Sequence, residues 1–124
     1  MGERMVLDIT THFTPYSLNL SRREPVDFFV EIQNKSKEPT TATVQLRTGY
    51  RLAFDMGGLK NSQEIRLENL GPNEKREWYF SIFPRVNTEI GENPLQLKIL
   101  EHYKEDFSLV KRKYNLDLTL RARK

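Results

Sequence analysis

Apolar and polar side chains alternate along residues 25–48, and this pattern predicts two β-strands joined by a polar corner. Successive side chains of a strand point to opposite faces, so an alternating apolar row turns one face toward a core. Residues 34–39 supply a turn between the two rows. We expect these strands to form a half-buried antiparallel pair that organises the chain. Their apolar rows are Val26, Phe28, Val30 and Ile32, then Ala42, Val44 and Leu46.

Similar alternation predicts further short strands in the rest of the chain. They cover residues 6–13, 16–20, 50–54, 63–67, 75–83, 95–100 and 107–122. Pro15 separates the first two, so we expect one strand split by a kink. Gly71 and Pro72 predict a turn within residues 70–74. The last segment would span about 50 Å if fully extended, so we expect a bulge or a break near residues 111–113.

The spacing of these segments predicts the fold class. No window sustains apolar residues at the i, i+3, i+4 and i+7 positions of a helix. Seven to nine short strands with turns between them are typical of a sandwich, so we predict an all-β, immunoglobulin-like sandwich of two antiparallel sheets. It would form a single domain over residues 5–122. A small closed barrel is the alternative, because the same pattern permits it.

Composition limits the chemistry, the partners and the cellular location that we expect for the protein. The 124 residues include no cysteine, which excludes disulfides and thiolate chemistry and favours a reducing compartment. Charged residues of both signs make up 30% of the chain, as in heat-adapted proteins, and the net charge of +3 is too small to indicate a nucleic-acid partner. No signal peptide or membrane span is visible. We therefore expect a cytoplasmic protein, or a cell-surface one if this is a fragment of an exported chain.

Three features together resemble a known group of domains. They are the strand that runs from Val26 into Asn34-Lys35-Ser36, the strand of Ala42, Val44 and Leu46, and the turn at residues 70–74 ahead of Trp78. This arrangement resembles the CARDB-type and related immunoglobulin-like domains of archaea and bacteria, over residues 26–99. The resemblance implies a binding or spacer module, often of cell-surface proteins, with no catalytic residues to transfer.

Candidate chemistry in the sequence is sparse. His12 and His102 are the only histidines, and His102 lies in a charged segment, residues 101–106, that could form a weak metal site or simply a hairpin turn. No serine lies in a nucleophile elbow, and no acid, base and nucleophile share a recognisable spacing. We therefore predict no enzyme activity, no metal and no cofactor.

Aromatic and basic side chains on the outward faces of strands are the candidate interaction surface. Outward aromatic residues that lie side by side form an apolar patch typical of interfaces. Outward basic residues on the last strand could hold an anionic surface, although Asp117 shares their face. The predicted surface consists of Phe29, Tyr79, Phe83, Tyr103, Lys111, Lys113 and Arg121.

These residues favour a non-catalytic module that binds a protein partner, or a second copy of itself, through a sheet face or an edge strand. A carbohydrate-binding module is an alternative, with Tyr79 and Tyr103 as a stacking platform. Weak nucleic-acid binding through the basic last strand is a further alternative.

Overall fold

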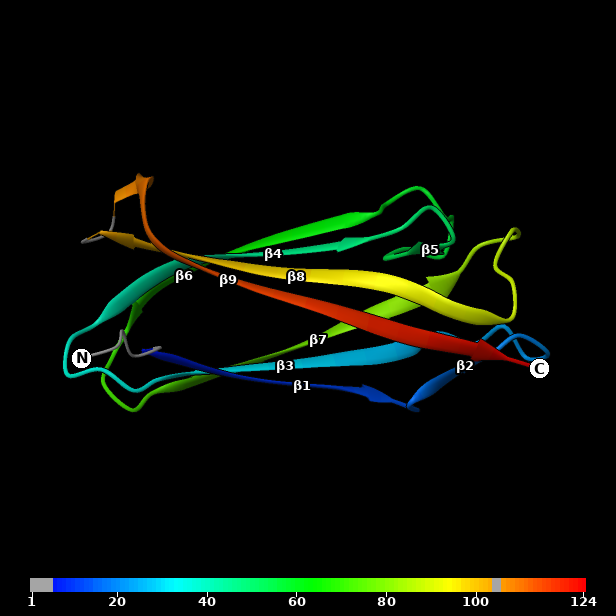
Figure 1. Cartoon of the computed structure of the whole chain (residues 1–124), viewed down its shortest axis with the longest axis horizontal. Helices are drawn as coiled ribbons and strands as arrows, with labels where there is room; N and C mark the ends of the chain where they lie inside the picture. Colours follow the sequence, from blue (N-terminus) through cyan, green and yellow to red (C-terminus); the bar gives the residue numbers. More distant parts are fainter. Residues whose placement is uncertain (1–5, 104–105) are drawn as a thin grey trace.

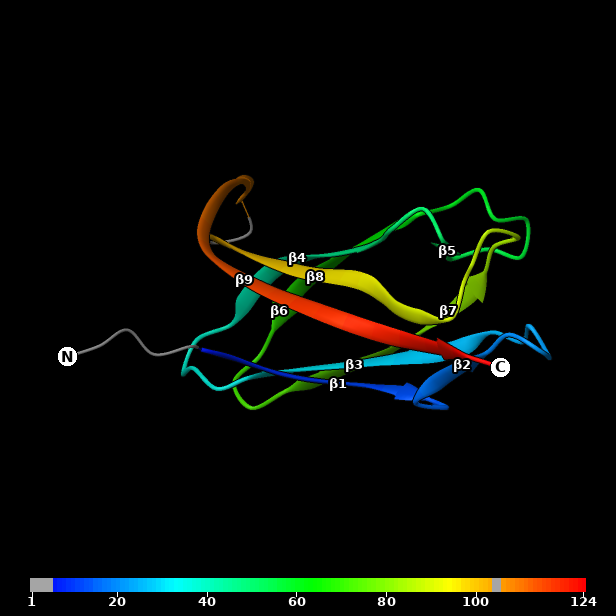
Figure 2. The ribbon, with the colours of Figure 1, turned by 45° about the vertical axis from the view of Figure 1, so that its right-hand side comes forward.

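The chain folds into two β-sheets that face each other across one layer of apolar side chains (Figure 1). The computed structural model describes residues 6–103 and 106–124. Position 5 of the predicted domain lies outside the described residues, as do Lys104 and Glu105 of the charged segment. The sheets remain separate layers when the molecule is turned, as Figure 2 shows. No helix among the described residues is long and apolar enough to cross a membrane.

Nine strands of the described residues make up two separate sheets, which confirms the predicted all-β sandwich rather than a closed barrel. Sheet A has the order β1 (Leu7–Thr14), β3 (Val26–Asn34), β7 (Lys75–Pro84) and β5 (Leu52–Ala53). Sheet B has the order β2 (Ser17–Asn19), β9 (Asp106–Arg123), β8 (Gly91–Tyr103), β4 (Thr40–Thr48) and β6 (Ser62–Leu70).

Strands β3 and β4 lie in different sheets, so the prediction that they pair with each other is wrong. The antiparallel partners of β3 are β1 and β7, and those of β4 are β6 and β8. Alternation shows only which side of a strand is buried, and that side is the same whether two strands pair or face each other across a core. The polar corner after β3 is the point where the chain passes from sheet A to sheet B.

Asn34 fixes this corner, because its buried side chain uses all of its hydrogen-bonding groups. Its Nδ2 donates to the carbonyl oxygens of Glu38 and Leu70, each at 2.8 Å. Its Oδ1 accepts from the backbone N and the Oγ of Ser36, at 2.9 and 2.7 Å. Its backbone forms two further bonds, of 3.0 and 2.7 Å, with the turn at residues 70–74, which returns the chain to sheet A. One residue therefore connects both crossings.

The predicted apolar rows face the core. The largest fully buried side chains come from both sheets, and each contributes about 1.5–3 kcal/mol when it leaves water. They include Phe28, Ile32, Leu46, Ile82, Leu97 and Ile99. The rows of β1 and β9 are less completely covered, since Ile9, Leu116 and Leu118 are only partly buried. The sandwich is therefore not fully closed along the side where β1 and β9 run.

The first strand is split as predicted. β1 pairs antiparallel with β3, the chain crosses at the cis Thr14–Pro15 peptide, and β2 then pairs with β9. The β2–β9 pair is parallel. Sheet B therefore differs from the prediction, which was a wholly antiparallel sheet. The predicted strand at residues 50–54 is reduced to Leu52–Ala53, which pairs with the end of β7.

The long β8–β9 hairpin bends where a bulge was predicted. Glu101 lies opposite Arg112 and His102 lies opposite Val110, so Lys111 has no partner in the ladder. This confirms the bulge. Beyond it the start of β9 curls away from the sheet, at the upper left of Figure 1.

We expect Asn34→Ala to lower the free energy of unfolding by roughly 3 kcal/mol, because the buried carbonyl of Leu70 and the part-buried carbonyl of Glu38 lose their donor and the loss of a buried donor costs about 1–3 kcal/mol. Urea denaturation followed by the fluorescence of Trp78 measures the change. Asn115→Ala, at an exposed site of β9, is the control and should change stability by less than about 0.5 kcal/mol. Equal effects of the two substitutions would contradict the role of Asn34.

Candidate functional site

Three aromatic rings form a row across the outer face of sheet A. The strand register places His12 of β1 opposite Phe29 of β3, and Phe29 opposite Tyr79 of β7. The rings of His12 and Phe29 stack with centroids 4.5 Å apart and an interplanar angle of 23°, and those of Phe29 and Tyr79 lie 5.1 Å apart at 54°. We call His12, Phe29 and Tyr79 the aromatic row. It spans the full width of the three long strands of sheet A.

The members of the aromatic row differ greatly in exposure. Phe29 is only 8% exposed although it points outward, because His12 and Tyr79 cover it from both sides. The Tyr79 side chain is 66% exposed. Aromatic pairs across neighbouring strands stabilise a sheet by about 0.2–1 kcal/mol each, so the contact with Phe29 favours the observed position of the Tyr79 ring. Tyr79 is therefore an accessible aromatic group with a neighbour that supports it.

Polar and acidic residues flank the aromatic row on both sides. One neighbouring cross-strand row contains Asp27 and Ser81, whose Oγ donates to Asp27 Oδ1 at 3.3 Å. The other contains Glu31 and Glu77. Glu31 also forms a salt bridge of 3.9 Å with Lys75. An aromatic strip with a polar rim is the arrangement found at protein interfaces.

The structure divides the predicted interaction surface between the two sheets. Phe29, Tyr79 and the half-buried Phe83 belong to sheet A, where Phe83 lies opposite Ala53 of β5. The remaining residues belong to the β8–β9 hairpin of sheet B. These are Tyr103, Lys111, Lys113 and Arg121, all exposed. A single platform of Tyr79 and Tyr103 is therefore not formed.

The exposed residues of the hairpin have local partners of their own. The Nζ of Lys111 lies 5.8 Å from the centre of the Tyr103 ring, a cation–π contact. Arg121 forms a salt bridge of 3.4 Å with Glu92, in which both side chains are exposed. Such surface pairs contribute about 0–1 kcal/mol, so they do not prevent these side chains from meeting a partner.

His102 and Phe107 fasten the curled tip of the hairpin to the outer face of sheet B. Nε2 of His102 lies 2.7 Å from Oγ1 of Thr43, and its Nδ1 lies 2.8 Å from the carbonyl oxygen of Leu109. The Phe107 ring lies over His102, and the Arg66 guanidinium lies over Phe107 at 4.5 Å. Both nitrogens of His102 are thus occupied by structural bonds rather than directed toward a metal ion.

Glu101 and Tyr114 form a buried polar pair under the same hairpin. The Tyr114 hydroxyl donates to Glu101 Oε1 at 3.1 Å, and both side chains are buried. Burial and the nearby Glu101 carboxylate raise the pKa of Tyr114, although hydrogen bonds from the backbone of Leu7 and from Arg112 act in the opposite direction. Because Leu7 belongs to β1, this pair also connects sheet A to sheet B.

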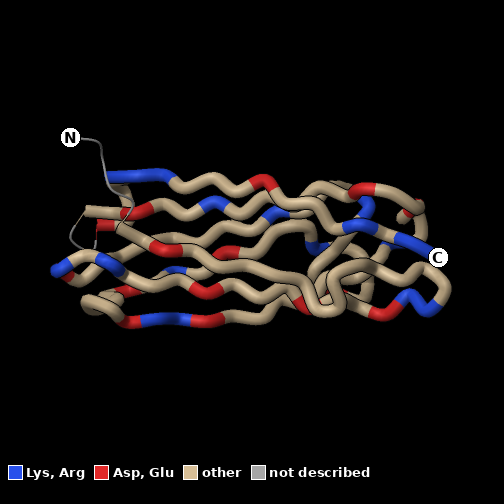
Figure 3. The backbone as a smooth tube through the Cα atoms, turned by 60° about the horizontal axis from the view of Figure 1, so that its bottom comes forward, with Lys and Arg blue, Asp and Glu red and all other residues tan. Residues whose placement is uncertain are grey.

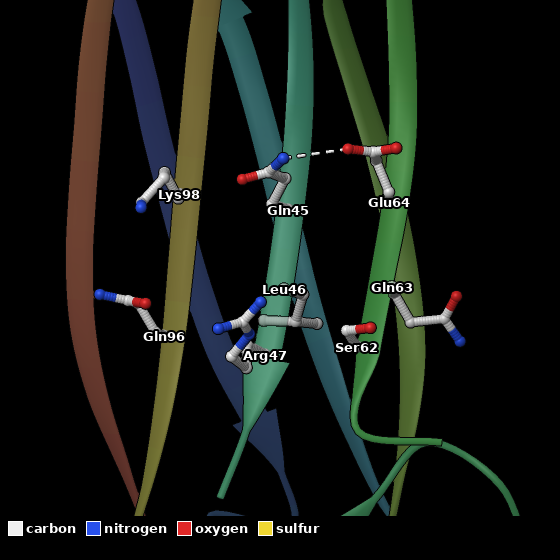
Figure 4. Close-up of a pocket in the computed structure, with 8 residues that line it drawn as sticks. All are labelled: Gln45, Leu46, Arg47, Ser62, Gln63, Glu64, Gln96 and Lys98. Atoms are coloured by element: carbon white, nitrogen blue, oxygen red, sulfur yellow. Dashed lines mark hydrogen bonds between the residues drawn. The ribbon is translucent and has the colours of Figure 1, made fainter. Parts of the chain in front are cut away.

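The outer face of sheet B has a shallow polar hollow over β4, between β6 and β8 (Figure 4). Gln45 Nε2 donates to Glu64 Oε1 at 3.0 Å across its floor. Its lining is Gln45, Leu46, Arg47, Ser62, Gln63, Glu64, Gln96 and Lys98. No aromatic side chain lines the hollow, so it offers no platform on which a sugar ring could stack.

No metal-binding arrangement is visible in the part of the chain that the structure describes. Within residues 6–103 and 106–124 no three His, Asp or Glu side chains are grouped so that they could hold a metal ion. The sequence reasoning missed His12 and Phe107 as partners of surface aromatics. Their roles depend on strand register and on the bend of the hairpin, which alternation does not show.

Comparisons with known proteins support the fold. No protein-family profile matches the chain, and no characterised protein matches it by sequence. Similar solved structures include a FixG-related protein from Vibrio parahaemolyticus, with a TM-score of 0.57 and 8% identity over 96% of this chain and 98% of that one. Self-complemented MyfA, the major subunit of Myf fimbriae from Yersinia enterocolitica, gives a TM-score of 0.54 and 12% identity over 94% and 99%.

A type III cohesin module from the cell-surface anchoring scaffoldin ScaE of Ruminococcus flavefaciens is also similar, with a TM-score of 0.50 and 8% identity over 89% of this chain and 73% of that one. At these identities the likeness establishes the fold alone. The chain is an immunoglobulin-like β-sandwich, as the sequence predicted.

We expect the stability of the protein to fall as the pH rises above about 10. The folded state holds the phenolic proton of Tyr114 more tightly than the unfolded state, because its pKa is raised above 10.0. The resulting stabilisation is complete below the unfolded pKa and is lost as the pH rises through the folded pKa. Urea denaturation from about pH 8 to about pH 11 measures this slope.

Tyr114→Phe should flatten that slope and should also lower stability near neutral pH by about 1–3 kcal/mol, since Glu101 loses a buried donor. Tyr103→Phe, which removes an exposed hydroxyl group, is the matched control and should keep the wild-type slope. A slope unchanged by Tyr114→Phe would show that other groups cause the alkaline loss.

Proposed function

We propose that this chain is a non-catalytic protein-interaction module that binds a protein partner through the aromatic row of sheet A. The observation that supports this most directly is Tyr79, which is 66% exposed yet held in a tilted ring contact with Phe29. Tyrosine is enriched at the energetically dominant positions of interfaces, because it buries a large rigid ring and loses little conformational freedom. The polar rim supplies directional contacts around that ring.

A protein surface suits the aromatic row better than a polysaccharide does. Sugar recognition of the predicted kind needs two exposed rings side by side with amide or carboxylate neighbours, and Tyr79 and Tyr103 lie on different sheets. Within the row the two exposed rings, Tyr79 and His12, are separated by the nearly buried Phe29, so they do not lie side by side. One anchoring tyrosine with flanking carboxylates fits a partner that presents a pocket and basic or hydroxyl groups.

The proposal also bears on where in the cell the module acts and whether it binds itself. Fimbrial subunits and the cohesin of a cell-surface scaffoldin share its fold, which supports a cell-surface role if the chain is part of a longer exported protein. The cytoplasmic location and the finer resemblance to CARDB-type domains remain predictions from the sequence. Self-association through the row is the second form of this proposal, since the neighbours include a subunit of fimbriae.

We expect Tyr79→Ser to weaken capture of the protein partner by about thirtyfold, as for the loss of a contact worth about 2 kcal/mol. Immobilised protein is incubated with an extract of the source cells, and the captured proteins are identified after washing at low and at high salt. Sedimentation of the purified protein tests self-association with the same variants. Contacts made by aromatic burial should survive high salt, because screening acts on exposed charges.

Tyr50→Ser is the matched control for this experiment. Tyr50 is 65% exposed, nearly as much as Tyr79, but it lies in the loop after β4 rather than on sheet A. The control should capture the same protein and assemble to the same extent as wild type. Equal loss with both variants, or recovery of nucleic acid alone that is washed away by salt, would contradict the proposal.

A further inference from the structure

Strand β9 is paired on one side along its length but on the other side only at its end. β8 accompanies it from Asp106 to Ala122. On the opposite side β2 pairs only with residues 121–123. No other strand of the described residues adjoins this edge along residues 113–120, so the backbone N–H and C=O groups of every second residue there point away from β8 and have no strand to pair with. A row of unpaired backbone groups is a template for another extended chain.

The open edge exists because the first strand changes sheet. β2 runs parallel to β9 and would continue along its edge if the chain before it stayed in sheet B. Instead the preceding residues cross at Thr14–Pro15, and β1 joins β3 in sheet A. The position beside the middle of β9 is therefore left for a strand that this domain does not supply there.

A groove adjoins this edge between the two sheets. It is lined by Leu7, Asp8, Ile9, Lys35, Tyr114, Asn115 and Leu116. Ile9 of β1 and Leu116 and Leu118 of β9 are only partly buried along this side. An added strand would place every second side chain toward these residues and the others toward solvent.

The charge of the edge strand selects the kind of chain that could be added. β9 contains five basic residues, Lys111, Arg112, Lys113, Arg121 and Arg123, against two acidic ones, Asp106 and Asp117. Its formal excess of three equals the net charge of +3 of the whole chain, so the other residues are balanced. Figure 3 shows basic stretches near both ends of β9 with one acidic position between them.

We infer that the open edge of β9 binds an extended acidic segment of a partner protein, which adds as a strand beside residues 113–119. The backbone of that segment pairs with the edge, its inward side chains are apolar and enter the groove beside Ile9 and Leu116, and its outward carboxylates meet Lys111 and Lys113. This site is separate from the aromatic row and does not depend on it.

A peptide fits the edge better than a nucleic acid or a second copy. Unpaired strand edges offer both N–H donors and C=O acceptors, and a peptide backbone complements both, whereas phosphates only accept. The outward positions from Asn115 to Thr119 include no aromatic ring on which a base could stack. Two β9 edges each have an excess of positive charge, so copies repel one another at this surface.

The test uses a fluorescein-labelled peptide of alternating glutamate and valine and a second peptide of alternating glutamate and proline. Both have equal charge, but the second lacks half of the backbone donors and cannot form a regular strand. Fluorescence anisotropy should show binding of the first peptide and at least about tenfold weaker binding of the second. Hydrogen exchange should show slower exchange of the amides of residues 113–119 on binding.

Charge variants provide the matched comparison. Lys111→Glu together with Lys113→Glu should weaken binding by at least about tenfold, since like charges then face each other across the pair. Arg22→Glu together with Lys60→Glu changes the net charge equally at exposed sites outside β9 and should leave the affinity unchanged. Tyr79→Ser should also leave it unchanged, which separates this result from that of the aromatic row.

Three results would overturn the inference. Equal affinity for the proline peptide would show attraction by charge alone, without strand addition. If an oligothymidylate binds more tightly than the glutamate and valine peptide, and the Lys111→Glu and Lys113→Glu variant loses that binding, the basic edge binds single-stranded nucleic acid. If the protein sediments as a dimer and the same variant sediments as a monomer, the edge binds a second copy of this chain.

Discussion

The buried amide of Asn34 is the interaction on which the arrangement of the two sheets depends. It bonds the corner that takes the chain from sheet A to sheet B and the turn that brings it back, so the two crossings hold each other in place. A buried amide with every group satisfied is directional, whereas burial of apolar side chains alone would tolerate sliding of one sheet over the other. The relative position of the sheets is therefore set at this end of the sandwich.

That fixed arrangement determines which surfaces remain free. The chain crosses between the sheets after β1, so β1 is the edge strand of sheet A. This pairing brings His12 alongside Phe29. The same crossing removes a neighbour from β9. The ordered aromatic row and the open basic edge thus have a common origin in the path of the first fifteen or so described residues.

Alternation along the chain predicted the strands and their buried faces well, because burial of one face is what selects an alternating sequence. It predicted the split first strand from Pro15 and the bulge at Lys111 from the length of β9. It did not predict that β3 and β4 lie in different sheets, because facing and pairing strands bury the same side. The long reach of the Asn34 side chain to Leu70 decides between the two arrangements, and no local pattern contains it.

The sequence predicted which residues belong to the candidate interaction surface. It did not predict that they lie on two separate surfaces, one on each sheet. Outward-facing aromatics can be found from the phase of each strand, yet whether Phe29 is exposed depends on what lies opposite it in neighbouring strands. Phe29 is nearly buried because the rings of His12 and Tyr79 cover it. Its ring in turn supports Tyr79, whose side chain stays exposed.

The two surfaces differ in the physics by which they can bind. The face of sheet A surrounds its aromatic row with Asp27, Glu31 and Glu77, while the excess positive charge lies along β9. Burial of Tyr79 depends little on salt, and attraction to Lys111 and Lys113 is screened within about 10 Å at moderate ionic strength. Opposite charge and different salt dependence allow one small domain to contact two unlike partners, or two parts of one partner, without competition between the sites.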